Sequence, residues 1–600
     1  MKNALLAAAP FLTRCKTHLK IAPALCAFLL LPAARPAAAS STDTFVSVAA
    51  SPVSNLDPAA MYETRSLAAA LNIYEPLVVF TTDSAKTPVA PFLASAVPTR
   101  ENGLLSADLK TYTFPIRPGV AFHDGSILTA EDVRYSLLRF MLSDFVGGPS
   151  AMLLEPVLGV PSIRDRKGRL RVDFKTAAAT VTTDADRVVV RLCKPDATFL
   201  AVLASWPLVM SKAWAAAAGE WDGTESSWLR LKGRLPEQSR LRFAANGTGP
   251  FRVTEPVSKE LVTLERFEGY WRRKPAALKR VVLREVDSEM LRLSMLEAGD
   301  ADTAELSRSS LRDAAEAPGV RVDEGLPAWS AGRIIFFNFR TAAQDNPCLR
   351  SGRLDGRGIP PDFFSDSNVR QGFAHAFDYE VFLTQALRGQ GERAAGPIPF
   401  SRFSWQPPAP AYGHDRAKAT EQLQKAWQGR LWAQGFQAEI GYDAADPEAQ
   451  AAAEILAAEL KAIKPEFALL PKPLRRSSLL KAIREHRLPI FVGGFEPDYP
   501  DPHSYAFNLL HSAGFYPAAQ GFARKAIDSV VEKARRSREH REALYRDLMD
   551  LYAAELPQIY LYYPVGFRAL RRNVSEASPD IWMGPFTLHN ALYFRHVRKN

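Results

Sequence analysis

Three carboxylates lie close together in the segment 491–502, whose sequence is FVGGFEPDYPDP. An apolar run that ends in two glycines, typical of a buried strand, is followed by Glu496, Asp498 and Asp501 between prolines. Because proline fixes the backbone angle φ, the loop is stiff. Carboxylates in such a place can pair with a cation, although aspartates in loops also form turns and caps. The segment is therefore a candidate site for a positively charged group.

The motifs of several common enzyme classes are absent from this sequence. It contains no Walker-type phosphate loop, no Gly-x-Ser-x-Gly elbow and no His-Glu-x-x-His pair. The run 247–250, GTGP, begins like a dinucleotide fingerprint, but it lacks the third glycine and its proline opposes a helix start. His503 near the acidic loop could help to bind a hard metal ion, yet loop acids are more often caps. We expect no catalytic residue and no metal site, and hence capture of a solute without chemical change.

Residues 1–39 have the pattern of a secretory signal peptide. Basic residues come first, the apolar run Ile21–Leu31 follows, and Ala37-Ala-Ala39 forms a small-residue cleavage pattern. The apolar run is shorter than the roughly 20 residues that span a bilayer. Cys26 follows a leucine where a lipid-modified cysteine requires a small residue, which argues against a lipid anchor. We therefore expect a periplasmic protein that has lost its signal peptide.

Composition excludes some functions and leaves others open. Five of the 75 basic and none of the 65 acidic residues lie in 1–39, so the remainder has 70 against 65 and a net charge of +5. This small charge favours solubility and does not indicate nucleic-acid binding. The length and the 47% of hydrophobic residues predict two or more domains with large cores. Cys193 and Cys348 remain after cleavage, and whether they form a disulfide stays open.

Periodicity and turn residues predict a mixed α/β chain. A capping pair at Thr129 and Asp132 predicts a helix over 130–142, and apolar spacing predicts another over 447–463. Alternation over 251–267 predicts a hairpin, and the range 558–563 reads as a final buried strand. The tryptophan-rich range 206–245 has weak periodicity and reads as an insertion made of loops. Alternating helices and strands in the second half favour α/β layers.

Motifs spread over most of the chain resemble one family, the extracytoplasmic solute-binding proteins of dipeptide and oligopeptide (peptide/nickel) ABC transporters, solute-binding family 5. The motifs occur in the order expected for that family, which makes their combination more specific than any one of them. They are Ser54–Pro58, Tyr74–Leu77, Tyr112–Gly119, Phe122–Gly125, Leu128–Val133, Gly247–Phe251, Gly269–Trp271 and Asn368–Phe377.

The resemblance implies an α/β fold, the large form of the type II periplasmic-binding-protein fold, with two lobes and an extra domain in the first. Applied to this sequence, it divides the mature chain into five parts after the signal peptide at 1–39. The first lobe takes 40–80, 246–330 and 564–600, the extra domain takes 81–245, and the second lobe takes 331–563.

The resemblance also gives roles to residues of the acidic loop. It implies that Asp498 holds the α-ammonium group of a bound peptide, and that Phe495 stands where relatives have tryptophan, which removes an indole N–H. The backbone at Gly494 and Glu496 is expected to pair with the peptide like an added strand. Tyr62 is the residue expected to face this site from the first lobe.

The function implied is that of a peptide receptor for an ABC importer. Its partners would be the peptide and, transiently, permease and ATPase subunits; it would act as a monomer without a cofactor and without nucleic acid. Val492 stands where an oligopeptide-binding relative has arginine, so the pairing of the peptide carboxylate is open. Two alternatives remain: the same scaffold could bind a nickel chelate, haem or an opine-like solute, or the protein could be an envelope hydrolase.

Overall fold

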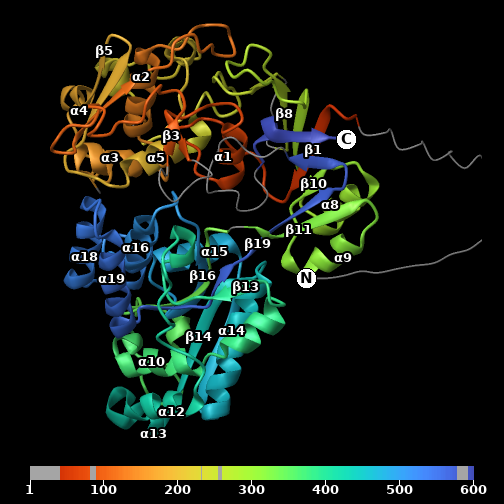
Figure 1. The fold of residues 1–600 in the computed structure, drawn as a ribbon. Coiled ribbons are helices and arrows are strands. Elements are labelled where there is room, and N and C mark those ends of the chain that lie inside the picture. Colours follow the sequence, from red (N-terminus) through yellow and green to blue (C-terminus); the bar gives the residue numbers. More distant parts are fainter. Residues whose placement is uncertain are drawn as a thin grey trace, which may run out of the picture. The chain divides into compact units, whose positions relative to one another are not determined.

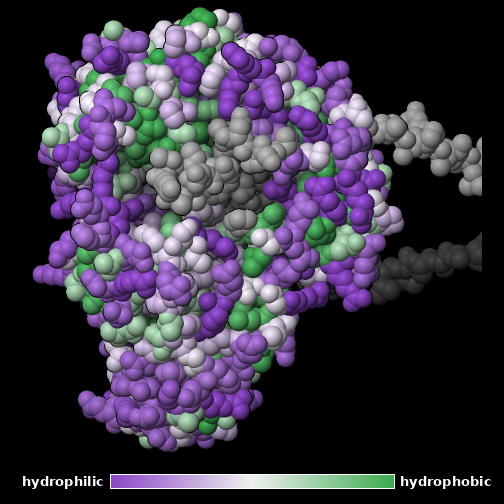
Figure 2. Space-filling view, viewed as in Figure 1, coloured by the Kyte–Doolittle hydropathy of each residue, from purple (hydrophilic) through white to green (hydrophobic). Residues whose placement is uncertain are grey.

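The computed structural model describes residues 41–80, 89–165, 167–231, 233–254, 258, 260–326, 328–576 and 592–600. The signal peptide expected at 1–39 lies outside these residues. In the part described, no helix is both long and apolar enough to cross a membrane. The face shown in Figure 2 is mostly hydrophilic, with hydrophobic residues in separate patches.

A seven-stranded sheet contains strands from the start, the middle and the end of the chain. Its order is β11 (Val320–Leu326), β19 (Gly566–Arg571), β10 (Thr303–Ala304), β1 (Thr44–Ala49), β9 (Arg280–Glu285), β8 (Leu261–Arg266) and β7 (Phe251–Val253). β1 is parallel to β9 and β10, whereas β7 and β8 form the antiparallel hairpin predicted at 251–267. The segments that form this sheet are those that the resemblance assigns to the first lobe, although the boundaries themselves stay a prediction.

A five-stranded sheet is built from the second half of the chain. Its order is β15 (Phe467–Leu474), β14 (Phe436–Asp443), β16 (Ile490–Phe495), β12 (Ala331–Phe337) and β17 (Gln558–Tyr560). Helix α14 (Pro447–Ile463) packs against β14 and β15, as Figure 1 shows. It begins where predicted because Asp446 caps it, accepting a hydrogen bond from the N–H of Ala449, and Pro447 occupies its first position.

A smaller antiparallel sheet lies in the range 111–191. Its order is β4 (Thr111–Pro115), β6 (Arg187–Arg191) and β5 (Val181–Asp184), and helix α2 (Ala130–Leu142) packs against β5 and β6. The capping box predicted at Thr129 and Asp132 is present in both directions. The insertion over 206–245, expected to be loops, also contains α6 (Lys212–Ala217), α7 (Glu225–Trp228) and the 3-10 turn Pro236–Gln238. Ser211 and Thr224 cap the two helices.

The prediction of one final buried strand over 558–563 is wrong. The range divides into β17 and β18 (Tyr562–Pro564), which pairs with β13 (Gly391–Arg393) in a separate two-stranded sheet. The chain then continues into β19, β20 (Val574–Glu576) and β21 (Val597–Lys599). A continuous apolar run shows that residues are buried, but it does not show where a strand changes sheets.

The remaining elements cover these sheets or connect them. Cys193 is exposed and Cys348 is buried, and both are free thiols, so the two do not form a disulfide. The other helices and strands are α1 (Thr64–Ala70), β2 (Val78–Phe80), β3 (Val89–Pro91), α3 (Ala151–Leu158), α4 (Phe174–Thr180), α5 (Phe199–Ser205), α8 (Glu289–Ala298), α9 (Leu311–Glu316), α10 (Ser367–Ala376), α11 (Tyr379–Val381), α12 (Arg416–Lys425), α13 (Arg430–Gln434), α15 (Arg476–Arg484), α16 (Pro502–Leu510), α17 (Phe515–Gln520), α18 (Lys525–Arg536) and α19 (Arg541–Glu555).

Candidate ligand-binding site

The acidic loop joins the end of β16 to the start of α16. Asp501 is the N-cap of α16 and accepts a hydrogen bond from the N–H of His503 at 2.8 Å. It also accepts two bonds from the Arg541 guanidinium, at 2.8 and 2.6 Å. All of these bonds hold the loop and the helices together. Asp501 therefore has a structural role in the loop and is not a candidate to bind a ligand cation.

Asp498 lies half-buried in this loop and does not point into bulk water. Its carboxylate accepts hydrogen bonds from the Tyr62 hydroxyl at 2.6 Å and from Asn508 Nδ2 at 3.0 Å. Its backbone N–H donates to Ser504 Oγ. Burial raises the pKa of Asp498, and the two side-chain donors oppose that rise. Both donors are neutral, so the carboxylate retains a charge that a ligand cation could balance.

Two aromatic residues from distant parts of the chain contact the same loop. Trp206 donates its indole N–H to the backbone carbonyl of Asp498 at 2.6 Å, and its ring lies 5.4 Å from that of Tyr62. The loop thus receives an indole N–H from another segment, whereas Phe495 has none. Sequence reasoning missed Trp206 because it lies in a region of weak periodicity, where only its residue type was a signal.

The other predicted site residues lie around Asp498. Phe495 is half-buried and contacts the ring of Tyr505, with centroids 5.6 Å apart. The Gly494 carbonyl accepts a hydrogen bond from the Tyr516 hydroxyl at 2.6 Å, so this acceptor is already engaged. Glu496 is exposed, and its carboxylate accepts a bond from Thr64 at 3.2 Å.

Strand β16 is paired along the whole of one edge but along only part of the other. β12 pairs with the strand along its whole length, whereas β14 pairs only with Ile490 and Phe491. The range 492–495 thus has no partner on the β14 side among the strands described. An added strand needs such an edge, although the role of Gly494 and Glu496 in it stays a prediction.

Several motifs of the resemblance meet at Glu75 and stabilise the fold. This fully buried carboxylate accepts hydrogen bonds from the Thr248 hydroxyl, the Tyr270 hydroxyl and the Trp271 indole, each at 2.8 Å. The three donors come from the motifs 247–251 and 269–271. Burial raises the pKa of Glu75 to about 7, although all three donors favour the charged form.

We expect Glu75→Gln to flatten the pH dependence of stability. The folded-state pKa of about 7 lies above the usual 4.5, so the folded state binds more protons between these values, and stability falls as pH rises through this window. This fall amounts to about 3 kcal/mol at most in the free energy of unfolding. Melting temperatures at pH 5 and pH 8 measure it, with exposed Glu260→Gln as the control. A fall of equal size in wild type and Glu75→Gln would contradict the assignment.

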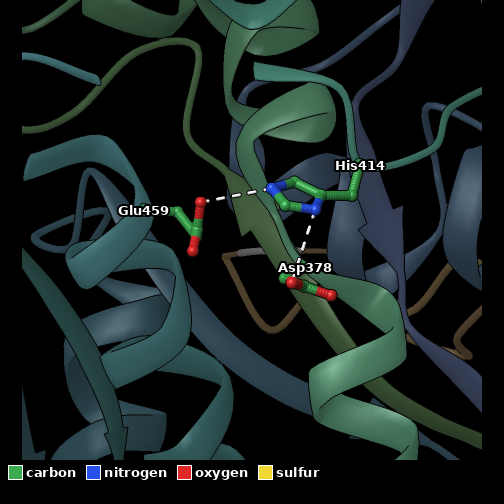
Figure 3. Close-up of side chains that lie close together, drawn as sticks. All are labelled: Asp378, His414 and Glu459. Atoms are coloured by element: carbon green, nitrogen blue, oxygen red, sulfur yellow. Dashed lines mark hydrogen bonds and ion pairs between the residues drawn. The ribbon is translucent and has the colours of Figure 1, made fainter. Parts of the chain in front are cut away.

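A histidine between two carboxylates forms a separate cluster, shown in Figure 3. His414 Nδ1 lies 3.3 Å from Asp378, and its Nε2 lies 3.2 Å from Glu459 on α14. Such a group resembles a metal site, but each ring nitrogen faces a different carboxylate. The Arg416 guanidinium also donates to both oxygens of Glu459, at 2.7 and 2.9 Å. We interpret the cluster as structural: its ion pairs and hydrogen bonds hold the loop before α12 against helix α14.

Comparison with known proteins identifies the family. Residues 89–517 match the bacterial extracellular solute-binding proteins, family 5 (middle region), so the chain belongs to this family. Heme-binding protein A of Haemophilus influenzae is 25% identical over 562 residues, which cover 90% of each chain. The dipeptide-binding protein of Escherichia coli (strain K12) is 23% identical over 537 residues, 84% of this chain and 86% of that protein.

Solved structures show the same fold. The periplasmic binding protein DppA from Helicobacter pylori, in complex with peptide STSA, has a TM-score of 0.68 at 20% identity and covers 93% of this chain and 98% of its own. NikZ from Campylobacter jejuni, in complex with Ni(L-His), has a TM-score of 0.67 at 18% identity and covers 93% and 100%. The fold is thus the mixed α/β periplasmic-binding-protein fold. The chain is a solute-binding receptor of an ABC transporter, which implies permease partners, and it is not an enzyme.

Proposed function

We propose that this receptor captures di- to oligopeptides in the periplasm and delivers them to permease and ATPase subunits. The observation that carries the proposal is the half-buried carboxylate of Asp498, whose two side-chain donors are neutral. A buried charge is costly unless an opposite charge balances it, and the α-ammonium group of a peptide provides that balance.

The contacts of Tyr62 and Trp206 suggest how ligand binding is coupled to closure. Both residues lie in segments assigned to the first lobe and its extra domain, whereas Asp498 lies in a segment assigned to the second lobe. A ligand held by Asp498 while these contacts form favours the closed state by its differential affinity for that state. The lobe boundaries given above are part of this proposal.

Arg65 is a candidate partner for the peptide carboxylate. Val492, where a relative has arginine, is only 1% exposed within β16 and cannot serve. Arg65 follows Tyr62 by three residues, and its two terminal nitrogens make only long bonds of 3.3 Å to Ser47. Its Nε is buried without a hydrogen-bond partner in the part of the chain described. Burial lowers the pKa of Arg65 to about 10, with Glu305 opposing the shift.

We expect Arg65→Met to weaken binding of a tripeptide with a free carboxylate by roughly 10- to 100-fold, the range of a lost charge-assisted hydrogen bond. The same tripeptide with a C-terminal amide should bind both proteins equally. Calorimetry with the two peptides measures the difference, and Arg280→Met, on an exposed position of β9, is the control. An equal loss for both peptides would assign Arg65 a structural role instead.

The second candidate function is the binding of haem, a nickel chelate or an opine-like solute by the same scaffold. A relative named for haem covers 90% of this chain, and a structural neighbour holds Ni(L-His). Native mass spectrometry of protein purified without denaturation tests the choice, together with its absorption spectrum and metal content. We expect bound masses that fragment as peptides. A Soret band or stoichiometric nickel would decide against peptides.

Calorimetry with a peptide pool then tests the site. If an ammonium group is recognised, acetylating the peptide N-termini should abolish most of the binding heat, because acetylation removes the positive charge. Undiminished binding of the acetylated pool would reject the role given to Asp498 while leaving peptide capture possible.

A further inference from the structure

A cavity of about 340 Å³ lies in the insertion at 206–245, apart from the residues of the proposed peptide site. Its volume falls in the range of small-molecule sites. Its polar lining is basic in sum, because three arginines face one carboxylate. These lining residues are Glu220, Arg230, Arg234, Gln238 and Arg240.

The carboxylate in the lining is already fully engaged. Arg234 donates to both oxygens of Glu220, at 2.9 and 2.7 Å, and Arg139 donates at 3.1 Å. Burial opposes ionisation of Glu220, but the bonds from Arg234 and the charge of Arg139 outweigh it, so the pKa falls to about 2. Arg139 is itself balanced by Asp57, with which it forms a buried ion pair. These four groups therefore neutralise one another.

Two cations remain at the cavity. Arg230 and Arg240 are exposed, and in the part of the chain described neither guanidinium makes a hydrogen bond or an ion pair. Gln238 uses its side-chain oxygen to accept from the N–H of Leu235, which leaves its amide N–H groups for another acceptor.

The position of Arg240 depends on a glycine. Gly219 has a φ of +83°, and a Cβ there would lie 3.1 Å from Arg240 Nη1. The Arg240 side chain therefore occupies space that a side chain at position 219 would need, so a larger residue there would displace it.

We propose that this cavity binds a compact phosphate-bearing anion, with Arg230 and Arg240 as its charged contacts and the Gln238 amide as a further donor. Guanidinium groups bind phosphate oxygens through paired N–H bonds, so two of them can bind one phosphate group or two linked ones. The phosphate group could belong to a small soluble molecule or to a phospholipid headgroup at the membrane surface, and the experiment separates these sources.

The first arm is calorimetric titration of the full mature chain with inorganic pyrophosphate at low salt. We expect Arg230→Gln and Arg240→Gln each to weaken binding at least 10-fold, and sodium chloride to weaken binding to wild type. Arg187→Gln removes an equal charge from an exposed position on β6 and should change affinity less than twofold. Equal affinities in all four proteins would overturn the proposal.

The second arm is sedimentation with vesicles of phosphatidylglycerol or of phosphatidylcholine. Binding only to phosphatidylglycerol, reduced by pyrophosphate and by Arg240→Gln, assigns the site to a headgroup. Pyrophosphate binding without vesicle binding assigns it to a soluble anion, and binding of neither overturns the site. Because Asp498 is not part of the cavity, Asp498→Asn should leave pyrophosphate affinity unchanged, so this test is independent of peptide capture.

Discussion

Asp498→Asn should reduce the affinity for peptides with a free N-terminus by roughly 30- to 5,000-fold, equivalent to about 2–5 kcal/mol for a buried, hydrogen-bonded charge pair that loses one partner. The substitution keeps the size of the side chain. Asparagine can still accept from the Tyr62 hydroxyl, whereas the bond from Asn508 is lost, because Asn508 Nδ2 also donates to the Ser504 carbonyl and its amide stays as it is. The change therefore removes the negative charge with little loss of packing, and calorimetry at pH 7 measures the effect.

Two controls separate the charge of Asp498 from general damage to the loop. Glu496→Gln removes a neighbouring exposed charge and should change affinity less than threefold, because the role proposed for position 496 uses its backbone. Peptides acetylated at the N-terminus should bind wild type and Asp498→Asn equally weakly. If Asp498→Asn binds free peptides as tightly as wild type does, the ammonium site lies elsewhere.

The raised pKa of Asp498 adds a pH dependence with a definite sign. A carboxyl group whose pKa lies above its usual value becomes protonated, and hence neutral, at a higher pH than an exposed aspartate does. Ligand-free protein should therefore lose ammonium affinity early as pH falls, whereas a bound ammonium opposes protonation. Affinities in wild type should converge on those of Asp498→Asn at acidic pH.

Arg139→Met should be the most destabilising single change among those considered, with a loss of about 3–5 kcal/mol in the free energy of unfolding. The guanidinium is buried in α2 and joins Asp57, from the opening motif, to Glu220, and the side chains of all three are no more than 1% exposed. Without it, two buried carboxylates lose their shared cation.

Urea denaturation of three variants tests this expectation. Arg134→Met, on the same helix, removes a cation that is 25% exposed and pairs with Glu131, and should cost less than about 1 kcal/mol. Adding Asp57→Asn to Arg139→Met should recover part of the lost stability, because one orphaned charge disappears. If Arg139→Met proves as stable as Arg134→Met, the expectation is wrong, and water must reach the ion pair of Arg139 and Asp57.

Local signals in the sequence predicted many elements accurately. Helix α2 was expected from its capping box, and α14 from the spacing of its apolar residues. These signals act within a few residues of the element that they define. The strand range 558–563 was predicted wrongly because sheet membership depends on partners elsewhere in the chain.

At the candidate site, too, the local features of the acidic loop could be predicted from the sequence, whereas its long-range contacts could not. Its stiffness and its position after a buried strand followed from residues 491–502 alone. That Asp501 pairs with Arg541, and that Trp206 reaches the backbone of Asp498, depends on residues 40 and 292 positions away. No pattern within one segment contains this information.

By itself, the amino-acid sequence determined the family and the α/β class, because these depend on motifs and on local backbone preferences. It also singled out Asp498 as the residue to test for binding an ammonium group. The tertiary structure decided which of the acidic groups are structural, which aromatic residue supplies an indole N–H, and which arginines at the cavity make no hydrogen bond or ion pair among the residues described. The physical reason is that burial and charge balance depend on all neighbours in space, and those neighbours come from segments hundreds of residues apart.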